Sequence, residues 1–260
     1  MNEILECIFS TGEFEGPDGQ QIKVRANIPR EEGDFLQRIV RSVNPTVSLE
    51  VGLAYGVSAM IICDSLQRTP ETRHIVIDPF QHRETWGFGA GLNNLKKAGH
   101  GDIVEFHNVD SQTALPQLAA SGLKIDFAFV DGGHTFDHCL VDFFYIDRML
   151  RVGGVVAFDD TNRPTISKVI RFIVTNRNYS VYAALDPARS RPLSLKRRLL
   201  LELARRSARV SGAVEQLFKP QVLEPDASLG ISGGRCVALK KEDDDTRGGA
   251  GPSDIGHRDF

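Results

Sequence analysis

The stretch VSLEVGLAYGVSAMIICDSL, from Val47 to Leu66, decides the fold because its pattern changes twice within a short distance. The branched, apolar run Val47–Val51 predicts a buried strand, and Ser58–Leu66 predicts a helix. Glycines separate the two. The stretch therefore predicts a strand, a tight loop and a helix in succession, which is a common place for a ligand in α/β proteins.

The glycines of this loop, Gly52 and Gly56, are spaced GxxxG. This spacing differs from the dinucleotide pattern GxGxxG and from the phosphate-binding pattern GxxxxGKS/T. Glu50 lies at the start of the loop, where its negative charge would repel a pyrophosphate. The loop therefore predicts a ligand other than a dinucleotide.

Strand-like and helix-like segments alternate after this stretch. The predicted strands are Val47–Val51, His74–Ile77, Ile103–His107, Phe127–Val130 and Gly154–Phe158. The predicted helices between and after them are Ser58–Leu66, Thr85–Lys97, Gln112–Ala120, Phe136–Leu150 and Thr165–Val174. Two further strands, YSVYAAL and GRCVALKK, come later without such a helical crossover and predict an antiparallel pair at one edge. The alternation predicts a parallel sheet covered by helices on both faces.

The composition is that of an ordinary globular chain. The 260 residues are 41% hydrophobic and 25% charged, and a net charge of −3 gives no reason to expect nucleic acid as a partner. The four cysteines form no CxxC or metal-binding pattern, which favours a reducing compartment. The N-terminus resembles no secretory signal, and no apolar run reaches the roughly 18 residues of a membrane span, so we expect a cytoplasmic protein.

The chain divides into a main domain and flanking segments. Residues 1–28 predict an irregular N-terminal extension with a hairpin around EGPDGQQI, and residues 29–241 predict the domain, which begins with a helix in IPREEGDFLQRIVRSV. Residues 186–230 predict a basic helical insertion. It could be a lid, a patch for an anionic substrate, a membrane-surface helix, or a solvated helix packed on the domain or on a second subunit. Residues 242–260 predict a disordered tail.

A carboxylate comes after every one of the five predicted parallel strands. These acids are Glu50, Asp78, Asp110, Asp131, and the pair Asp159 and Asp160. Ser111 follows Asp110 directly. The carboxyl ends of parallel strands meet at one edge of a sheet, where α/β proteins bind ligands. Asp78, some distance beyond the glycine loop, is suited to accept hydrogen bonds from ribose hydroxyls, although a turn or helix-cap role is the alternative.

These motifs and their order resemble the class I S-adenosylmethionine-dependent methyltransferases, and in particular the metal-dependent small-molecule O-methyltransferases of the catechol and caffeoyl-CoA type and their natural-product or sugar O-methyltransferase relatives. Residues 28–59 resemble the entry helix and ExGxxxGxS loop of that family, and residues 125–160 its fourth strand, helix and fifth strand. The resemblance implies a doubly wound, Rossmann-like α/β fold with a seven-stranded sheet, mostly parallel with an antiparallel last strand.

The resemblance also implies which residues hold S-adenosylmethionine (SAM). Its cofactor-binding residues would be Glu50, Gly52, Tyr55, Gly56, Ser58, Asp78, Asp110, Ser111 and Asp131. Glu50 and Gly52 would face the methionine portion, Asp78 the ribose, and Asp110 with Ser111 the adenine. An acidic loop suits this cofactor because the cofactor carries a sulfonium and an ammonium.

The remaining carboxylates suggest a metal. Asp131, Asp159 and Asp160 are hard oxygen ligands, and in the resembling enzymes the corresponding acids bind Mg²⁺ or another divalent cation. Such an ion would lower the pKa of a substrate hydroxyl and orient it. The alternative is that FDDTN is only a strand exit and helix cap. Asp131 and His134 are the candidate catalytic acid/base residues.

The sequence thus predicts a Mg²⁺-assisted O-methyltransferase for a hydroxylated small molecule, a sugar, polyol or phenolic compound of natural product biosynthesis. Alternatives are a SAM-binding enzyme of another reaction type, a non-catalytic partner subunit, and an NAD-dependent dehydrogenase, which the GxxxG loop disfavours. A homodimer or a higher homo-oligomer is left open.

Overall fold

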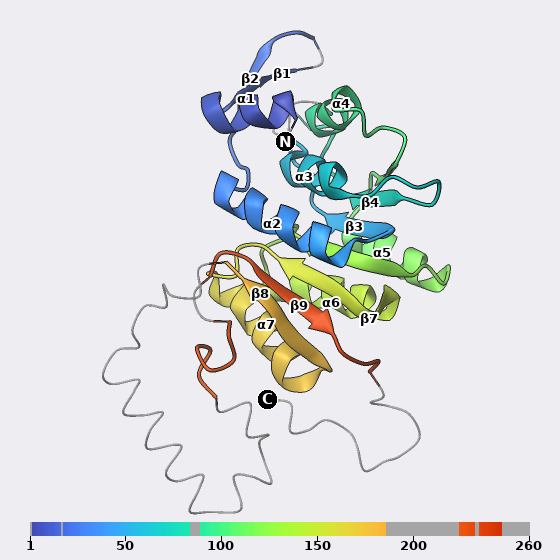
Figure 1. The fold of residues 1–260 in the computed structure, drawn as a ribbon, viewed down its shortest axis with the longest axis vertical. Helices are drawn as coiled ribbons and strands as arrows, with labels where there is room; N and C mark the ends of the chain where they lie inside the picture. Colours follow the sequence, from blue (N-terminus) through green and yellow to red (C-terminus); the bar gives the residue numbers. More distant parts are fainter. Residues whose placement is uncertain (1, 17, 84–88, 186–223, 232–233, 246–260) are drawn as a thin grey trace, which may run out of the picture.

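Seven strands of the described residues form one sheet in the computed structural model (Figure 1). The structure describes residues 2–16, 18–83, 89–185, 224–231 and 234–245. The strand order is β5-β4-β3-β6-β7-β9-β8. The bounds are β3 Val47–Val51, β4 Arg73–Ile77, β5 Val104–His107, β6 Ile125–Val130, β7 Leu150–Phe158, β8 Tyr179–Ala184 and β9 Val237–Lys241. All neighbours pair in parallel except β9, which is antiparallel to both β7 and β8.

Helices cover both faces of this sheet. One layer contains α2 Arg30–Val43, α3 Val57–Ser65 and α4 Ala90–Lys97, which share a core with Phe127, Phe129 and other side chains of one face of the sheet. The opposite layer contains α5 Ser111–Ala120, α6 Phe136–Met149 and α7 Pro164–Asn176. Burying each branched or aromatic side chain of the central strands contributes about 1.5–3 kcal/mol, so the strands that carry the ligand loops are the most firmly held.

The predicted fold class is confirmed. The five parallel strands and the helices that alternate with them lie where the sequence patterns predict, within a few residues at their ends, and β8 and β9 form the predicted antiparallel pair. Of the predicted helix Thr85–Lys97, the first residues lie outside the described part of the chain, and α4 begins at Ala90. The chain runs from β3 toward β4 and β5 and then returns to β6 on the other side of β3, which makes the β3–β6 boundary the topological switch point.

The N-terminal extension is more ordered than the sequence predicted. The expected hairpin is present as β1 Glu13–Glu15 and β2 Gln21–Lys23, but the preceding residues form a helix, α1 Glu3–Thr11. Asn2 caps this helix by accepting a hydrogen bond from the Leu5 backbone N–H at 3.0 Å. The buried side chains of Leu5 and Ile8 anchor α1 on the domain.

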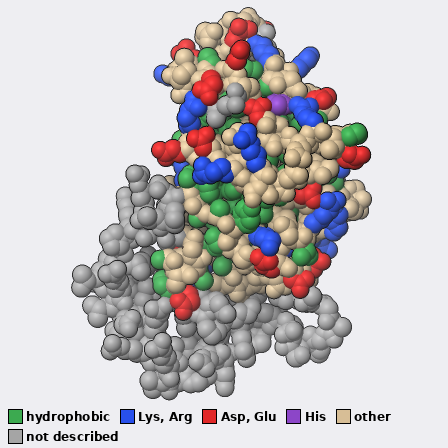
Figure 2. All heavy atoms as spheres, viewed as in Figure 1, with side chains coloured by type: hydrophobic (Ala, Val, Ile, Leu, Met, Phe, Trp, Pro, Cys, Tyr) green, Lys and Arg blue, Asp and Glu red, His purple; other side chains and the backbone are tan. Residues whose placement is uncertain are grey.

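Hydrophobic side chains gather on the face of the molecule where α2 and β8 lie side by side (Figure 2). A groove there is bounded by Phe35 and Ile39 of α2 and by Tyr182 of β8, whose hydroxyl lies 2.6 Å from the Ser42 Oγ. Most of the predicted basic insertion, residues 186–223, and the predicted tail from residue 246 lie outside the described residues. Within the described ranges, no helix has the length and apolarity needed to cross a membrane.

Candidate active site

A cavity of about 720 Å³ opens at the carboxyl ends of the central strands, at the switch point of the sheet. Its wall includes residues from the ends of β3, β4, β6 and β7 and from the segment between β2 and α2. Ten of the twelve sequence-predicted site residues line it, namely Gly52, Tyr55, Ser58, Asp78, Asp110, Ser111, Asp131, His134, Asp159 and Asp160. The two that do not are Gly56, which lies between two lining residues, and Glu50.

The glycine loop is held close to neighbouring backbone. Gly52 has a φ of 96°, and a Cβ atom built there would overlap the carbonyl oxygen of Asp131. Gly56 has a φ of 79°, and its Cβ would lie 2.9 Å from the carbonyl oxygen of Gly91. Side chains would therefore strain the backbone at both positions and displace their neighbours. The spacing GxxxG reflects these two close approaches.

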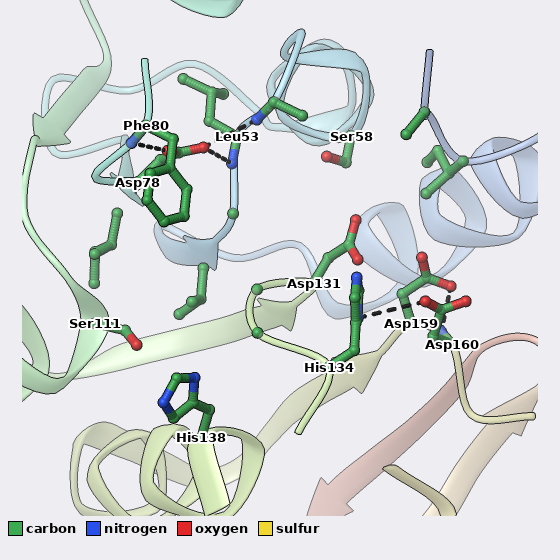
Figure 3. A pocket seen from close by; sticks show the side chains of 18 of the residues that line it. Leu53, Ser58, Asp78, Phe80, Ser111, Asp131, His134, His138, Asp159 and Asp160 are labelled. Atoms are coloured by element: carbon green, nitrogen blue, oxygen red, sulfur yellow. Dashed lines mark hydrogen bonds and ion pairs between the residues drawn. The ribbon is translucent and has the colours of Figure 1, made fainter. Parts of the chain in front are cut away.

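Asp78 organises this loop as well as lining the cavity. Its carboxylate accepts hydrogen bonds from the backbone N–H groups of Leu53 at 2.8 Å, Ala54 at 3.1 Å and Phe80 at 2.6 Å (Figure 3). Of the two roles weighed from the sequence, turn stabilisation is therefore observed, and ligand contact stays a prediction. Since each carboxylate oxygen can accept more than one hydrogen bond, these contacts leave room for a ligand hydroxyl.

Two amide side chains that the sequence patterns did not reveal hold the other side of the loop. Gln81 Nε2 donates to the Ala54 carbonyl at 2.8 Å, and Asn94 Nδ2 donates to the Tyr55 carbonyl at 3.1 Å. Both side chains are buried. In the sequence, Gln81 occurs in IDPFQ and Asn94 in AGLNNL, and neither belongs to a motif that would have indicated this role.

Glu50 lies beneath the cavity in a fully buried cluster. Its carboxylate accepts a hydrogen bond from Ser58 Oγ, and its other oxygen lies 3.1 Å from His74 Nε2. Ser48 Oγ lies 2.9 Å from the Nδ1 of the same imidazole. Because Nε2 faces a carboxylate, that nitrogen carries the proton. Glu50 was expected to face the ligand, and the alternation of side chains along β3 instead points it into the core.

The acidic end of the cavity is formed by the ends of β6 and β7. Figure 3 shows the imidazole of His134 between Asp131 and the pair Asp159 and Asp160. His134 Nδ1 lies 3.4 Å from Asp160 Oδ2, and Asp159 Oδ1 accepts the Asp160 backbone N–H at 2.5 Å. Burial raises the pKa of Asp131 well above its ordinary value, and the neighbouring charge of Asp159 adds to the shift. Asp131 and His134 lie together at this end of the cavity, as the sequence predicted.

Two further charged residues at this end were not predicted. Glu32 of α2 is 0% exposed, and Arg235, just before β9, donates from Nε to Glu32 Oε2 at 2.7 Å. Burial raises the pKa of Glu32 to about 9, and the neighbouring Asp159 contributes to the rise, whereas Arg235 opposes it. Asp131 and Glu32 therefore both have raised pKa values at this end, and Arg235 partly offsets the negative charge there.

Two of the carboxyl groups at this end, those of Asp160 and Glu32, form contacts with basic side chains of the protein. Asp160 Oδ2 lies 2.7 Å from Arg163 Nε in addition to its contact with His134. Among the residues that the structure describes, no three His, Cys, Asp or Glu side chains are arranged to hold a metal ion. The predicted ligand set of Asp131, Asp159 and Asp160 thus shares one end of the cavity but does not form a metal-binding group.

A family model described as a methyltransferase domain matches residues 49–161. This match runs from within β3 to just past the end of β7 and so includes the glycine loop and the acidic end of the cavity. The matched region is therefore similar to a methyltransferase domain. Its glycine loop and its carboxylates after β6 and β7 are the motifs on which the resemblance rested.

Relatives of known type match about half of the chain. A caffeoyl-CoA O-methyltransferase from Stellaria longipes is 30% identical over 136 residues, which cover 50% of this chain and 52% of that protein. A flavonoid 3′,5′-methyltransferase from Vitis vinifera is 28% identical over 138 residues, with 52% and 55% covered. The chain therefore spans about half the length of the curated relatives that it matches.

Solved structures share the fold. An O-methyltransferase from Bacillus cereus in complex with S-adenosylhomocysteine has a TM-score of 0.54 at 20% identity, covering 62% of this chain and 76% of that chain. A methyltransferase from Podospora anserina, also bound to S-adenosylhomocysteine, has a TM-score of 0.58 at 14% identity, covering 94% and 89%. The chain thus shares the fold of these structures, which is the architecture predicted from the sequence.

Proposed function

We propose that this protein is a SAM-dependent O-methyltransferase that acts on a hydroxyl group of a small molecule, such as a sugar, a polyol or a phenolic natural product. The observation that supports this most is that a single cavity joins the glycine loop to a cluster of carboxylates and a histidine. One part suits a cationic methyl donor, and the other suits a hydroxyl group that must lose a proton. The O-methyltransferases among the relatives support the same reaction class.

In the proposed reaction, an acceptor oxygen attacks the methyl carbon of SAM in line with the sulfur. The C–O bond forms as the C–S bond breaks, the sulfur keeps the electron pair, and S-adenosylhomocysteine leaves. Asp131 and His134 are proposed to receive the hydroxyl proton, since both line the cavity at its acidic end. The chain would contribute mainly alignment of the two substrates and removal of this proton.

The test is turnover of SAM by the purified full chain with a panel of sugars, polyols and catechols. We expect S-adenosylhomocysteine and a methylated product, both detected by mass spectrometry, in amounts that depend on the acceptor. Asp131→Asn should lower kcat by about 10²-fold or more. Asp137→Asn is the control, because Asp137 is exposed outside the cavity. Binding of SAM without transfer to any acceptor would favour a non-catalytic partner or another reaction type.

The sequence suggested Mg²⁺ assistance, but the arrangement of the carboxylates among the described residues fits a metal poorly. Asp160 is paired with Arg163 and His134, and Glu32 with Arg235, so positive charge from the protein already faces these acids. No step of the proposed reaction is therefore assigned to a metal. We expect turnover to survive exhaustive chelation within two-fold, and loss of turnover that Mg²⁺ restores would support the metal-assisted alternative.

A further inference from the structure

Two arginines enter the acidic end of the cavity from different parts of the chain. Arg163 lies directly before α7, and Arg235 lies shortly before β9. Both line the cavity, and their side chains are 52% and 43% exposed. The sulfonium and the ammonium of SAM gain nothing from such groups, because like charges repel. The one anionic group of SAM, its carboxylate, is expected by resemblance beside Gly56 and Ser58 of the glycine loop. The arginines at the acidic end are therefore left to a different ligand or to the carboxyl groups of the protein itself.

Each arginine uses its Nε atom to bind a carboxylate of the protein. Arg163 Nε lies 2.7 Å from Asp160 Oδ2, and Arg235 Nε lies 2.7 Å from Glu32 Oε2. Within the described ranges, the terminal nitrogens of these two side chains donate no hydrogen bond, and the shortest contact of each guanidinium to its carboxyl partner is made by Nε. A guanidinium anchored through Nε keeps its two terminal amino groups, which form the edge that binds a carboxylate or phosphate in a bidentate manner.

The backbone keeps these two residues next to each other. The Thr161 N–H donates to the Arg235 carbonyl at 3.0 Å, and the Arg163 N–H donates to the Asp160 carbonyl at 2.8 Å. The hydroxyl of Thr161 also donates to the Gly234 carbonyl. Arg163 and Arg235 thus flank the same short segment at the end of β7, and both line the cavity that also contains the proposed proton acceptors.

We propose that Arg163 and Arg235 bind an anionic group, a carboxylate or a phosphate, on the hydroxylated acceptor, and so select acidic acceptors over neutral ones. This inference rests on the proposed O-methyltransferase function and specifies its substrate class. The two guanidinium groups hold the anion, and the acceptor hydroxyl lies toward Asp131 and His134. A purely structural role is the competing explanation, in which the arginines only neutralise Asp160 and Glu32.

The test compares acceptors that differ only in charge. The pairs are 3,4-dihydroxybenzoate with its amide, glucuronate with glucuronamide, and glucose 6-phosphate with glucose, so that carboxylate and phosphate are examined separately. Binding to the full chain saturated with S-adenosylhomocysteine is measured by calorimetry, and kcat/KM is measured with SAM. We expect the acidic member of at least one pair to bind at least ten-fold more tightly than its neutral partner and to be turned over correspondingly better.

Variants separate recognition from structure. Arg163→Gln and Arg235→Gln should each reduce the affinity for the acidic member at least ten-fold and change the affinity for the neutral member by less than two-fold. Replacing either arginine by Lys instead should retain only part of the affinity for the acidic member. Arg73→Gln is the matched control, because Arg73 also pairs with a carboxylate, Glu105 at 3.2 Å, but lies outside the cavity. Thermal unfolding checks that each variant is folded.

The outcomes distinguish this inference from the function on which it rests. Equal binding of acidic and neutral members, binding of neither, or equal losses for both members in the arginine variants would overturn the inference. Methylation of neutral acceptors with no preference for acids would also overturn the inference about acidic acceptors, but it would support the O-methyltransferase function. Arginine-dependent binding of acids with no formation of S-adenosylhomocysteine would instead overturn the proposed function.

Discussion

Glu50 acts from beneath the cavity, so its charge rather than its contacts would affect a ligand. The side chain is 0% exposed, and Ser58 and His74 satisfy its carboxylate. A buried charge in a low dielectric is felt over a longer distance than an exposed one. The sequence correctly indicated an unusual carboxylate at this loop, but it could not show that the side chain points into the core.

Replacing Glu50 by Gln removes this charge with little change of shape. We expect Glu50→Gln to weaken SAM binding more than S-adenosylhomocysteine binding, since only SAM carries the sulfonium. The expected difference is about 1 kcal/mol, or roughly five-fold in Kd. Both dissociation constants are measured by calorimetry. In the control Ser58→Ala the charge stays, so both ligands should be affected by the same factor. Equal losses in Glu50→Gln would contradict an electrostatic role.

Gly52 offers a second test at the scale of one residue. A methyl group there would meet the Asp131 carbonyl while the backbone keeps a φ of 96°, so Gly52→Ala should lower stability by about 2–4 kcal/mol. Gly122→Ala has the same kind of φ, 79°, but no atom within 4 Å, and should cost only about 1 kcal/mol. Chemical denaturation measures both. Similar values for the two variants would show that the close approach does not matter.

At the scale of elements, the contact between α5 and α6 contains a buried acid that makes stability depend on pH. Asp142 is fully buried, and burial raises its pKa to about 6, although Ser111 and His138 oppose the shift. The folded state therefore holds this proton more tightly than the unfolded state, whose pKa is near 3.8. This group stabilises the fold at low pH, and the contribution is lost as the pH rises from about 4 through 6.

The Asp142→Asn variant should remove this dependence. Relative to the unchanged protein, we expect a gain in unfolding free energy of about 2–3 kcal/mol at pH 8 and little difference at pH 4. Denaturation by urea at both pH values measures it. Glu71→Gln changes an exposed carboxylate and is the control. If Asp142→Asn were destabilising at pH 8, the carboxylate would be making a contact worth more than its burial costs.

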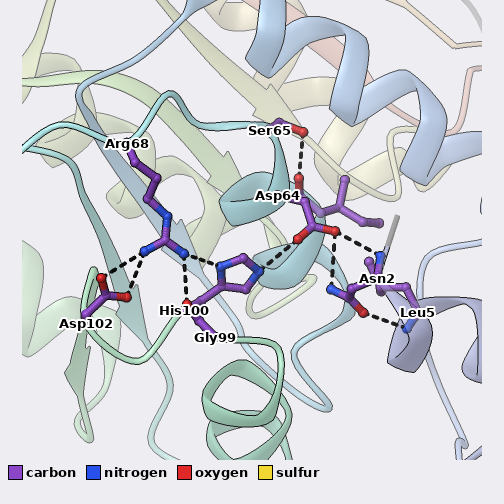
Figure 4. A network of polar contacts seen from close by, with 9 residues as sticks. Asn2, Leu5, Asp64, Ser65, Arg68, Gly99, His100 and Asp102 are labelled. Carbon is purple, nitrogen blue, oxygen red and sulfur yellow. Dashed lines mark hydrogen bonds and ion pairs between the residues drawn. The ribbon is translucent and has the colours of Figure 1, made fainter.

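The helix α1 shows why one element was not predicted. Figure 4 shows Asn2 bound to Asp64 of α3 through both its backbone and side-chain nitrogens, at 3.2 Å each. His100 Nε2 lies 2.9 Å from the same Asp64, and Arg68 donates to His100 Nδ1 at 2.7 Å. Burial would raise the pKa of Asp64, but these hydrogen bonds outweigh it and lower the pKa. A nine-residue helix is marginal by itself, and this distant network stabilises it.

For the whole molecule, the features that depend on local pattern and strand order were predictable from the sequence. Carboxylates after parallel strands had to meet at one edge of the sheet, and the structure brings Asp131, Asp159 and Asp160 there. The features that could not be predicted depend on contacts between distant parts of the chain. Glu32 and Arg235 are 203 positions apart, and neither belongs to a motif. The charge balance of the site therefore required the three-dimensional structure.

The last prediction concerns the stability of the whole chain with ligands. A ligand that binds only the folded state at about 100 times its Kd stabilises the fold by about 2.7 kcal/mol, which raises Tm by about 5–10 °C for a domain of this size. We expect such a rise with S-adenosylhomocysteine in differential scanning fluorimetry. NAD⁺ at equal concentration should give none, because the loop that would hold its pyrophosphate lacks the spacing GxGxxG. A rise with NAD⁺ alone would favour the dehydrogenase alternative, since the same topology serves both cofactors.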